Sequence, residues 1–224
     1  MAKNQIKTPK DDRYSLKGSS FWGVLIFAVL LIVDLVTKWL ADAYFNAEGT
    51  PRRITVIPNW IWLEIEYNPG ISYGMGSNAP EWVKLLVVIL TAVIMAALGV
   101  MYFKMDKRRT LLRLAFVFIV AGGVGNLIDR VYYRVWELDA TADVGVRDMV
   151  NLSRFGFAVC NFADFFITGG AVMMVLALLF FDRDAMYPVG AKYRALAKEH
   201  EAEEEKKKGQ TQENQTATGE KNNG

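Results

Sequence analysis

The sequence predicts an all-α membrane protein with four transmembrane helices. Its residues are 52% hydrophobic, and the mean hydropathy is +0.15. The apolar residues are concentrated in four long runs, three of which contain no charged residue. A helix needs about 20 residues to cross the hydrocarbon core of a bilayer, and each run reaches that length with its flanks. We expect spans at about residues 21–41, 82–103, 110–129 and 162–181.

The first span also has features of a secretory signal peptide. Basic residues precede it, and "ADA" at residues 41–43 resembles a cleavage site. Asp34 and Lys38 interrupt the apolar core before that site, and the apolar segment continues through Trp39 and Leu40. We therefore expect this segment to remain as a transmembrane helix.

The distribution of Lys and Arg predicts the orientation, because short loops rich in these residues stay cytoplasmic. Five lie in the first 20 residues, four in the turn 104–110 and eight after residue 181. The connections 42–80 and 129–161 are poorer, and we place them on the extracytoplasmic side. This gives a cytoplasmic segment 1–20, a membrane-embedded domain 21–182, and a cytoplasmic tail 183–224. The tail is expected to be disordered from about residue 200, where it becomes charged and low in complexity.

The two outer connections differ in pattern. In the first, "WLEIEY" alternates apolar and acidic residues, and Asn-Pro-Gly then signals a turn. We expect a small extracytoplasmic β-cradle over about residues 52–78, lying at the membrane surface. The second connection, 131–158, lacks a clear period, and we expect a helical or irregular gating loop.

The composition excludes several kinds of catalytic site. The chain has one cysteine, Cys160, and one histidine, His200, which lies in the polar tail. A nucleophile at Ser72, in the "GISYG" stretch, or at Cys160 therefore has no histidine base within the membrane domain. We expect no metal, no organic cofactor and no nucleic-acid partner, so hydrolysis would have to depend on carboxylates.

Three acids are predicted near the same membrane face. Asn126 with Asp129, and Asn161 with Asp164, share one N-x-x-D spacing, which puts each pair on one helix face. Asp148 lies in the apolar segment "VRDMVNL". Two neighbouring acids can share a proton and act as an acid–base pair, or they can relay protons in a small transporter. The spacing leaves both uses open, and its symmetry favours pairing Asp129 with Asp164.

Five motifs together resemble one known family. "DLVTK" (34–38), "NPGISYG" (68–74), "GNLIDR" (125–130), "VRDMVNL" (146–152) and "NFAD" (161–164) occur in the order typical of lipoprotein signal peptidases, the bacterial signal peptidase II family. The resemblance covers about residues 20–182. It implies a monomeric aspartic endopeptidase of the bacterial cytoplasmic (inner) membrane that removes signal peptides from diacylglyceryl-modified prolipoproteins. Its active site would lie at the extracytoplasmic face, with the substrate and the lipid bilayer as its partners.

The resemblance also implies roles for individual residues. The catalytic pair falls on Asp148 and Asp164, in place of the symmetric pair, and Asp129 becomes a supporting acid that helps to hold Arg130. The supporting or substrate-binding positions are Asn68, Asn126, Asp129, Arg130, Asn161, Asp34 and Lys38. From its i, i+4 spacing, we expect the pair Asp34–Lys38 to fix helix packing.

The chain departs from the family pattern at three places. Arg147 precedes Asp148 where a small apolar residue is usual, the stretch after "GNLIDR" is longer, and "GISYG" replaces Gly-Ala-Ala-Phe. If the longer stretch shifts the alignment, Asp129 or Asp143 becomes the partner of Asp164.

Overall fold

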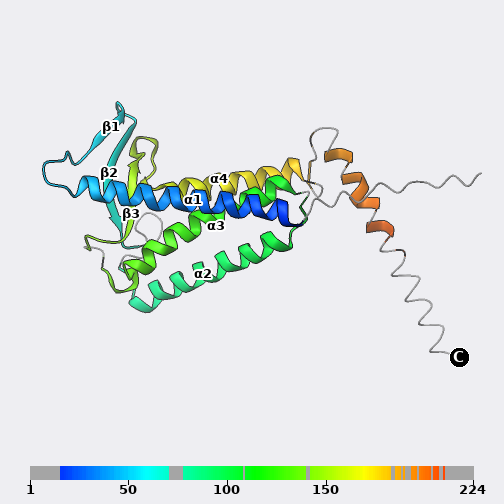
Figure 1. Cartoon of the computed structure of the whole chain (residues 1–224), viewed down its shortest axis with the longest axis horizontal. Helices are drawn as coiled ribbons and strands as arrows, with labels where there is room; N and C mark the ends of the chain where they lie inside the picture. Colours follow the sequence, from blue (N-terminus) through cyan, green and yellow to red (C-terminus); the bar gives the residue numbers. More distant parts are fainter. Residues whose placement is uncertain are drawn as a thin grey trace, which may run out of the picture.

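Four long helices lie side by side and form an elongated bundle (Figure 1). This computed structural model describes residues 16–70, 78–107, 109–139 and 142–182, with residues 185–187, 189, 193–195, 197–202, 204–206 and 209. The helices are α1 (Leu16–Phe45), α2 (Glu81–Lys104), α3 (Thr110–Tyr132) and α4 (Phe162–Leu176), and α4 continues into a π-helical turn, Ala177–Phe181. All four are long and apolar enough to cross a membrane, as the sequence predicted.

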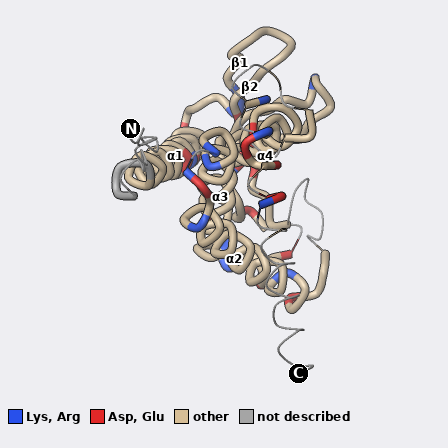
Figure 2. Tube along the Cα trace, turned by 90° about the vertical axis from the view of Figure 1, so that its right-hand side faces the viewer, with Lys and Arg blue, Asp and Glu red and all other residues tan. Residues whose placement is uncertain are grey.

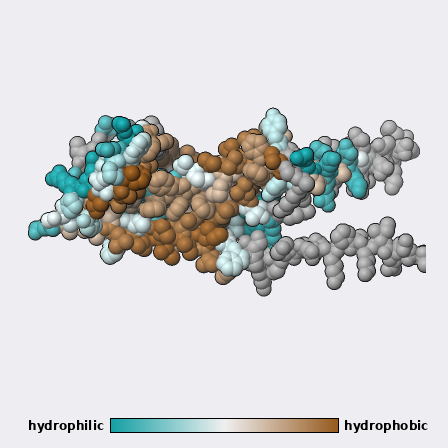
Figure 3. Space-filling model, turned by 90° about the horizontal axis from the view of Figure 1, so that it is seen from above, coloured by the Kyte–Doolittle hydropathy of each residue, from teal (hydrophilic) through white to brown (hydrophobic). Residues whose placement is uncertain are grey.

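Helix α3 is the central helix of the bundle. Over its most apolar stretch 56% of the residues are buried, compared with 11% in each of the other three spans. Small residues allow this packing, because a Cβ added at Gly122 would lie 2.3 Å from the backbone oxygen of Ala163 in α4. The outer faces of the helices are apolar over most of their length (Figure 3), as expected for surfaces in contact with lipid.

A four-stranded antiparallel sheet caps one end of the bundle (Figure 1). Its order is β1 (Ile54–Ile57), β2 (Ile61–Asn68), β3 (Val146–Asn151) and β4 (Val159–Cys160). The expected cradle therefore exists, but half of its strands come from the connection between α3 and α4. That connection also contains two short 3-10 helices, Val135–Glu137 and Ser153–Phe155.

The contribution of β3 was not visible in the sequence for a physical reason. Five of its six residues are buried, so it lacks the alternation of apolar and polar residues that marks a half-exposed strand. Strand β3 pairs with β2, so that Asp148 lies opposite Glu66 and Val150 lies opposite Leu63. The sheet thus carries Asp148 to the end of the bundle where α4 begins.

The terminal segments are only partly described. Residues 193–195, 197–202 and 204–206 are helical, so helix continues slightly past the point at which disorder was expected. The N-terminal segment 1–15 and the end of the tail lie outside the described residues.

Candidate active site

Helix α4 begins with a capping box that fixes the position of Asp164. The side-chain oxygen of Asn161 accepts a hydrogen bond from the backbone N–H of Asp164 at 3.1 Å. In return, the backbone N–H of Asn161 donates to Oδ2 of Asp164 at 3.0 Å. The N-x-x-D spacing in the sequence thus folds into a reciprocal cap, which directs the Asp164 carboxylate back toward the start of the helix.

Two amide side chains connect Asp164 to Asp148. Nδ2 of Asn161 donates to Oδ1 of Asp148 at 2.6 Å and to Oδ1 of Asn126 at 3.0 Å. Nδ2 of Asn126 then donates to Oδ1 of Asp164 at 2.8 Å. The two carboxyl groups, which are 16 positions apart in the sequence, therefore share one network of fixed donors.

The environment of Asp148 favours its protonated form. Burial, followed by the charge of Asp164, raises the pKa of Asp148 to about 7, against the effects of Lys38 and of hydrogen bonds from Asn161 and Asn68. At neutral pH, Asp148 can therefore act as a proton donor. A pair of acids in which one is protonated is suited to general acid–base chemistry.

Three fully buried charges lie behind this pair. Nζ of Lys38 is 2.9 Å from Oδ2 of Asp34 and 3.4 Å from Oδ2 of Asp129. It also donates to Oδ1 of Asn126 at 2.8 Å, while Oδ1 of Asp34 accepts from the backbone N–H of Ala163 at 2.8 Å. Charged positions inside the bundle, where α1 faces α3, are visible in Figure 2. The expected ion pair Asp34–Lys38 is present, and it also orients the amide that contacts Asp164.

The structure gives Asp129 other partners than the sequence suggested. Its carboxylate contacts Lys38 and Arg147, the latter at 2.6 Å. Arg130 instead donates to the backbone oxygen of Asn126 at 3.3 Å. Asp129 thus contacts two cations, whereas Asp148 is hydrogen-bonded to neutral amides. The amide network joins Asp164 to Asp148 and does not join it to Asp129.

The remaining candidates lie in different settings. Asn68, at the end of β2, hydrogen-bonds to Asp148, and its side-chain oxygen accepts from the N–H of Gly70 at 2.9 Å. Asp143 is exposed in the loop before β3. Burial and the nearby acids raise the pKa of Cys160 to about 12, which opposes formation of a thiolate nucleophile. Ser72 lies outside the described residues.

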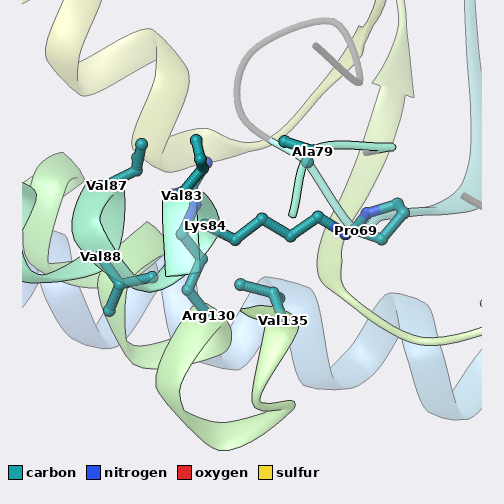
Figure 4. A pocket seen from close by; sticks show the side chains of 9 residues that line it. Pro69, Ala79, Val83, Lys84, Val87, Val88, Arg130 and Val135 are labelled. Atoms are coloured by element: carbon teal, nitrogen blue, oxygen red, sulfur yellow. The ribbon is translucent and has the colours of Figure 1, made fainter. Parts of the chain in front are cut away.

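A small, mainly apolar pocket adjoins this site (Figure 4). It is formed by the end of β2, the start of α2 and the end of α3. Its lining residues are Pro69, Gly70, Ala79, Val83, Lys84, Val87, Val88, Arg130 and Val135. Arg130 is common to the pocket and to the site, and Lys84 is the other basic residue of the lining.

Sequence reasoning missed two features of this region. It did not predict that Lys38 would contact Asn126, because the two residues are 88 positions apart. It noted Arg147 only as a departure from the family pattern, although the residue contacts Asp129. The sequence did contain a signal. Arg147 stands in the apolar segment "VRDMVNL", and a charge that becomes buried there needs a partner of opposite charge.

A profile of the family described as "Signal peptidase (SPase) II" matches residues 26–180. The chain belongs to the signal peptidase II family. The matched range includes the sheet, α2, α3, α4 and α1 from residue 26 onward, and with them every residue of the network described above. The family is one of peptidases.

Individual relatives agree with this assignment. A protein named lipoprotein signal peptidase from Bifidobacterium longum (strain NCC 2705) is 36% identical over 155 residues, which are 69% of this chain and 76% of the relative. One from Chlorobaculum tepidum is 34% identical over 163 residues, or 70% and 91% of the two chains. A solved structure described as a bacterial membrane enzyme has a TM-score of 0.56 and 26% identity, and it covers 71% of this chain and 93% of that one. The fold of four apolar helices and a small antiparallel sheet is therefore that of the family.

Proposed function

We propose that the chain is a membrane-embedded aspartic endopeptidase that cleaves the signal peptide from diacylglyceryl-modified prolipoproteins, with Asp148 and Asp164 as the catalytic pair. The observation that carries the proposal is the amide network, in which Asn161 contacts both acids and Asn126 contacts Asp164. Among the acids of the described residues near this end of the bundle, these two are joined by neutral donors.

In the proposed mechanism, Asp164 acts as the base and Asp148 as the acid. Asp164 takes a proton from water as the water oxygen attacks the scissile carbonyl carbon. Asp148 gives its proton to the carbonyl oxygen, which produces a gem-diol. The proton on Asp164 then passes to the leaving amine, a hydroxyl proton returns to Asp148, and the C–N bond breaks.

The supporting residues have roles that follow from their contacts. Lys38 and Asn161 both donate to the oxygen of Asn126, so its amide group is held with Nδ2 toward Asp164. Such fixed orientation matters because a displacement of about 1 Å can cost on the order of 100-fold in rate. Arg130 and Asn68 lie where they would contact the polar atoms of the substrate near the scissile bond.

The charge pattern supports a location for the site. Because the connections that form the sheet contain few Lys and Arg residues, we propose that this end of the bundle lies on the extracytoplasmic side of the bacterial inner membrane. The lipid chains of the substrate would stay in the bilayer, beside the exposed apolar faces of the helices. The protein would act as a monomer without a metal or organic cofactor.

The test is to replace Asp148 and Asp164 separately by Asn and to follow prolipoprotein cleavage by the purified protein in lipid nanodiscs. We expect both variants to lose at least 1000-fold in rate, since each removes one proton-transfer group. Asp143→Asn is the matched control, because this acid is exposed in the same connection, and it should cleave at the normal rate. Cleavage retained by either of the first two variants would contradict the assigned pair.

A further inference from the structure

Arg147 attaches strand β3 to the end of helix α3 at three points. Its Nη2 atom lies 2.6 Å from Oδ1 of Asp129, and its backbone N–H donates to Oδ2 of the same carboxylate at 3.2 Å. Its guanidinium also lies over the ring of Tyr133, 5.6 Å from the centroid. Both oxygens of one buried carboxylate are thus engaged by one residue of the strand.

This attachment is next to a residue of the proposed pair. Arg147 directly precedes Asp148 in β3, and neighbouring residues of a strand point to opposite faces. Holding Arg147 on one side of β3 therefore fixes the direction in which Asp148 leaves the other side.

The pairing of β3 with β2 is irregular next to this position. The register between β2 and β3 is interrupted between Leu63 and Glu66, directly before the pair Glu66–Asp148. An irregularity of this kind bends the strand and changes where the following side chain points. The contact with Asp129 adds a second constraint on β3 next to this irregularity.

The charges near Asp129 also depend on Arg147. Asp34, Lys38 and Asp129 are each completely buried, and together they carry one more negative than positive charge. Arg147, whose side chain is 12% exposed, brings the sum to zero. An unbalanced charge at such depth is costly, so loss of Arg147 would favour rearrangement around Asp129.

We propose that Arg147 is a positioning residue of the peptidase, whose two-point contact with Asp129 holds β3 where Asp148 meets Asn161. The inference rests on the proposed function. Arg147 does not touch the reacting atoms, and it acts through the strand and through the buried charges behind the site.

The test compares four variants in the prolipoprotein cleavage assay: Arg147→Leu, Arg147→Lys, Asp129→Asn, and the double variant Asp129→Asn/Arg147→Leu. We expect Arg147→Leu to lower kcat at least tenfold and to leave KM within about threefold, because the substrate contacts remain while the acid is displaced. Arg147→Lys should recover part of the loss, since it keeps the charge but not the planar fork. The double variant should be less impaired than the product of the two single effects, because it restores the charge balance.

Arg154→Leu is the matched control. Arg154 is exposed in the same connection, so its replacement removes an equal charge without touching Asp129, and kcat should not change. Amide hydrogen exchange across β3 gives a second readout, and it should be faster in Arg147→Leu than in the wild type. This readout and Arg147→Lys keep the inference testable if Arg147→Leu folds poorly.

Three failures can be told apart. If Asp148→Asn is inactive while Arg147→Leu cleaves at the normal rate or shows unchanged exchange in β3, the positioning role is refuted and the catalytic pair stands. If the effects of Asp129→Asn and Arg147→Leu simply multiply, the coupling between the two residues is refuted. Cleavage by Asp148→Asn would instead overturn the proposed function itself.

Discussion

The ionised carboxylate of Asp148 should lower the stability of the folded protein at alkaline pH. Its ordinary pKa is 3.8, and burial together with Asp164 raises the pKa to about 7 in the folded state. A difference of about three pKa units corresponds to about 4 kcal/mol, at 1.36 kcal/mol per unit. Because the folded-state pKa is raised, the stability linked to this group is complete below about pH 4 and is lost as the pH rises through about 7.

The variant Asp148→Asn removes the titration and keeps a similar shape. We expect it to be more stable than the wild type at pH 8, by up to about 4 kcal/mol, because the buried charge is absent. At pH 5 the folded wild type is mostly protonated at this residue, and the gain should fall below about 2 kcal/mol. Thermal unfolding of both proteins in detergent, measured at pH 5 and at pH 8, gives the difference in stability.

The exposed acid opposite Asp148 in the sheet provides the control. Glu66→Gln removes a carboxylate at the paired position of β2, and it should leave the unfolding temperature unchanged at both pH values. The reasoning would be refuted if Asp148→Asn were no more stable than the wild type at pH 8, or if its advantage were equal at pH 5 and pH 8.

Three further predictions concern packing, reactivity and the attachment of the sheet. Gly122→Val should destabilise the bundle by about 1–3 kcal/mol in thermal unfolding, because its Cβ meets the backbone of Ala163, whereas Gly169→Ala, with no atom within 4 Å, should be neutral. Since the pKa of Cys160 is raised to about 12, iodoacetamide at pH 8.5 should modify this thiol at least about 30-fold more slowly than a free cysteine; an equal rate would contradict its burial near the acids. Tyr67→Phe removes the hydroxyl that joins β2 to α1 and should lower the stability by about 1 kcal/mol, and an unchanged unfolding temperature would show that this bond contributes nothing.

The helices were predictable because lipid imposes a simple requirement. A segment that crosses a bilayer must be long, apolar and internally hydrogen-bonded, so each span is visible as one continuous run in the sequence. The expected span 110–129 corresponds to Thr110–Tyr132, and the expected span 162–181 to Phe162–Phe181. Strand β2 was also visible, since "WLEIEY" alternates. Strand β3 was not, because it is buried on both faces and pairs with residues of β2 that are 78 to 89 positions away.

The types of residue in the chain predicted more of the candidate site than the spacing between them did. The absence of a histidine in the membrane domain left carboxylates as the candidate groups, and the motif order pointed to Asp148 and Asp164. The repeated N-x-x-D spacing did not show that its two copies make different contacts. In one, Asn161 and Asp164 form a helix cap. In the other, Asn126 contacts Asp164 while Asp129 binds Lys38 and Arg147. These contacts join residues that are far apart in the sequence, so the spacing could not reveal them.

The sheet has a consequence for biosynthesis. Strands β1 and β2 leave the ribosome before α2 and α3, whereas β3 and β4 follow both helices. During synthesis, the edge of β2 that later pairs with β3 therefore stays unpaired until the connection after α3 has been made. Asp148 and Asn161 can meet only when β3 pairs with that edge and α4 packs against α3, so the amide network is completed by the last part of the domain to be made.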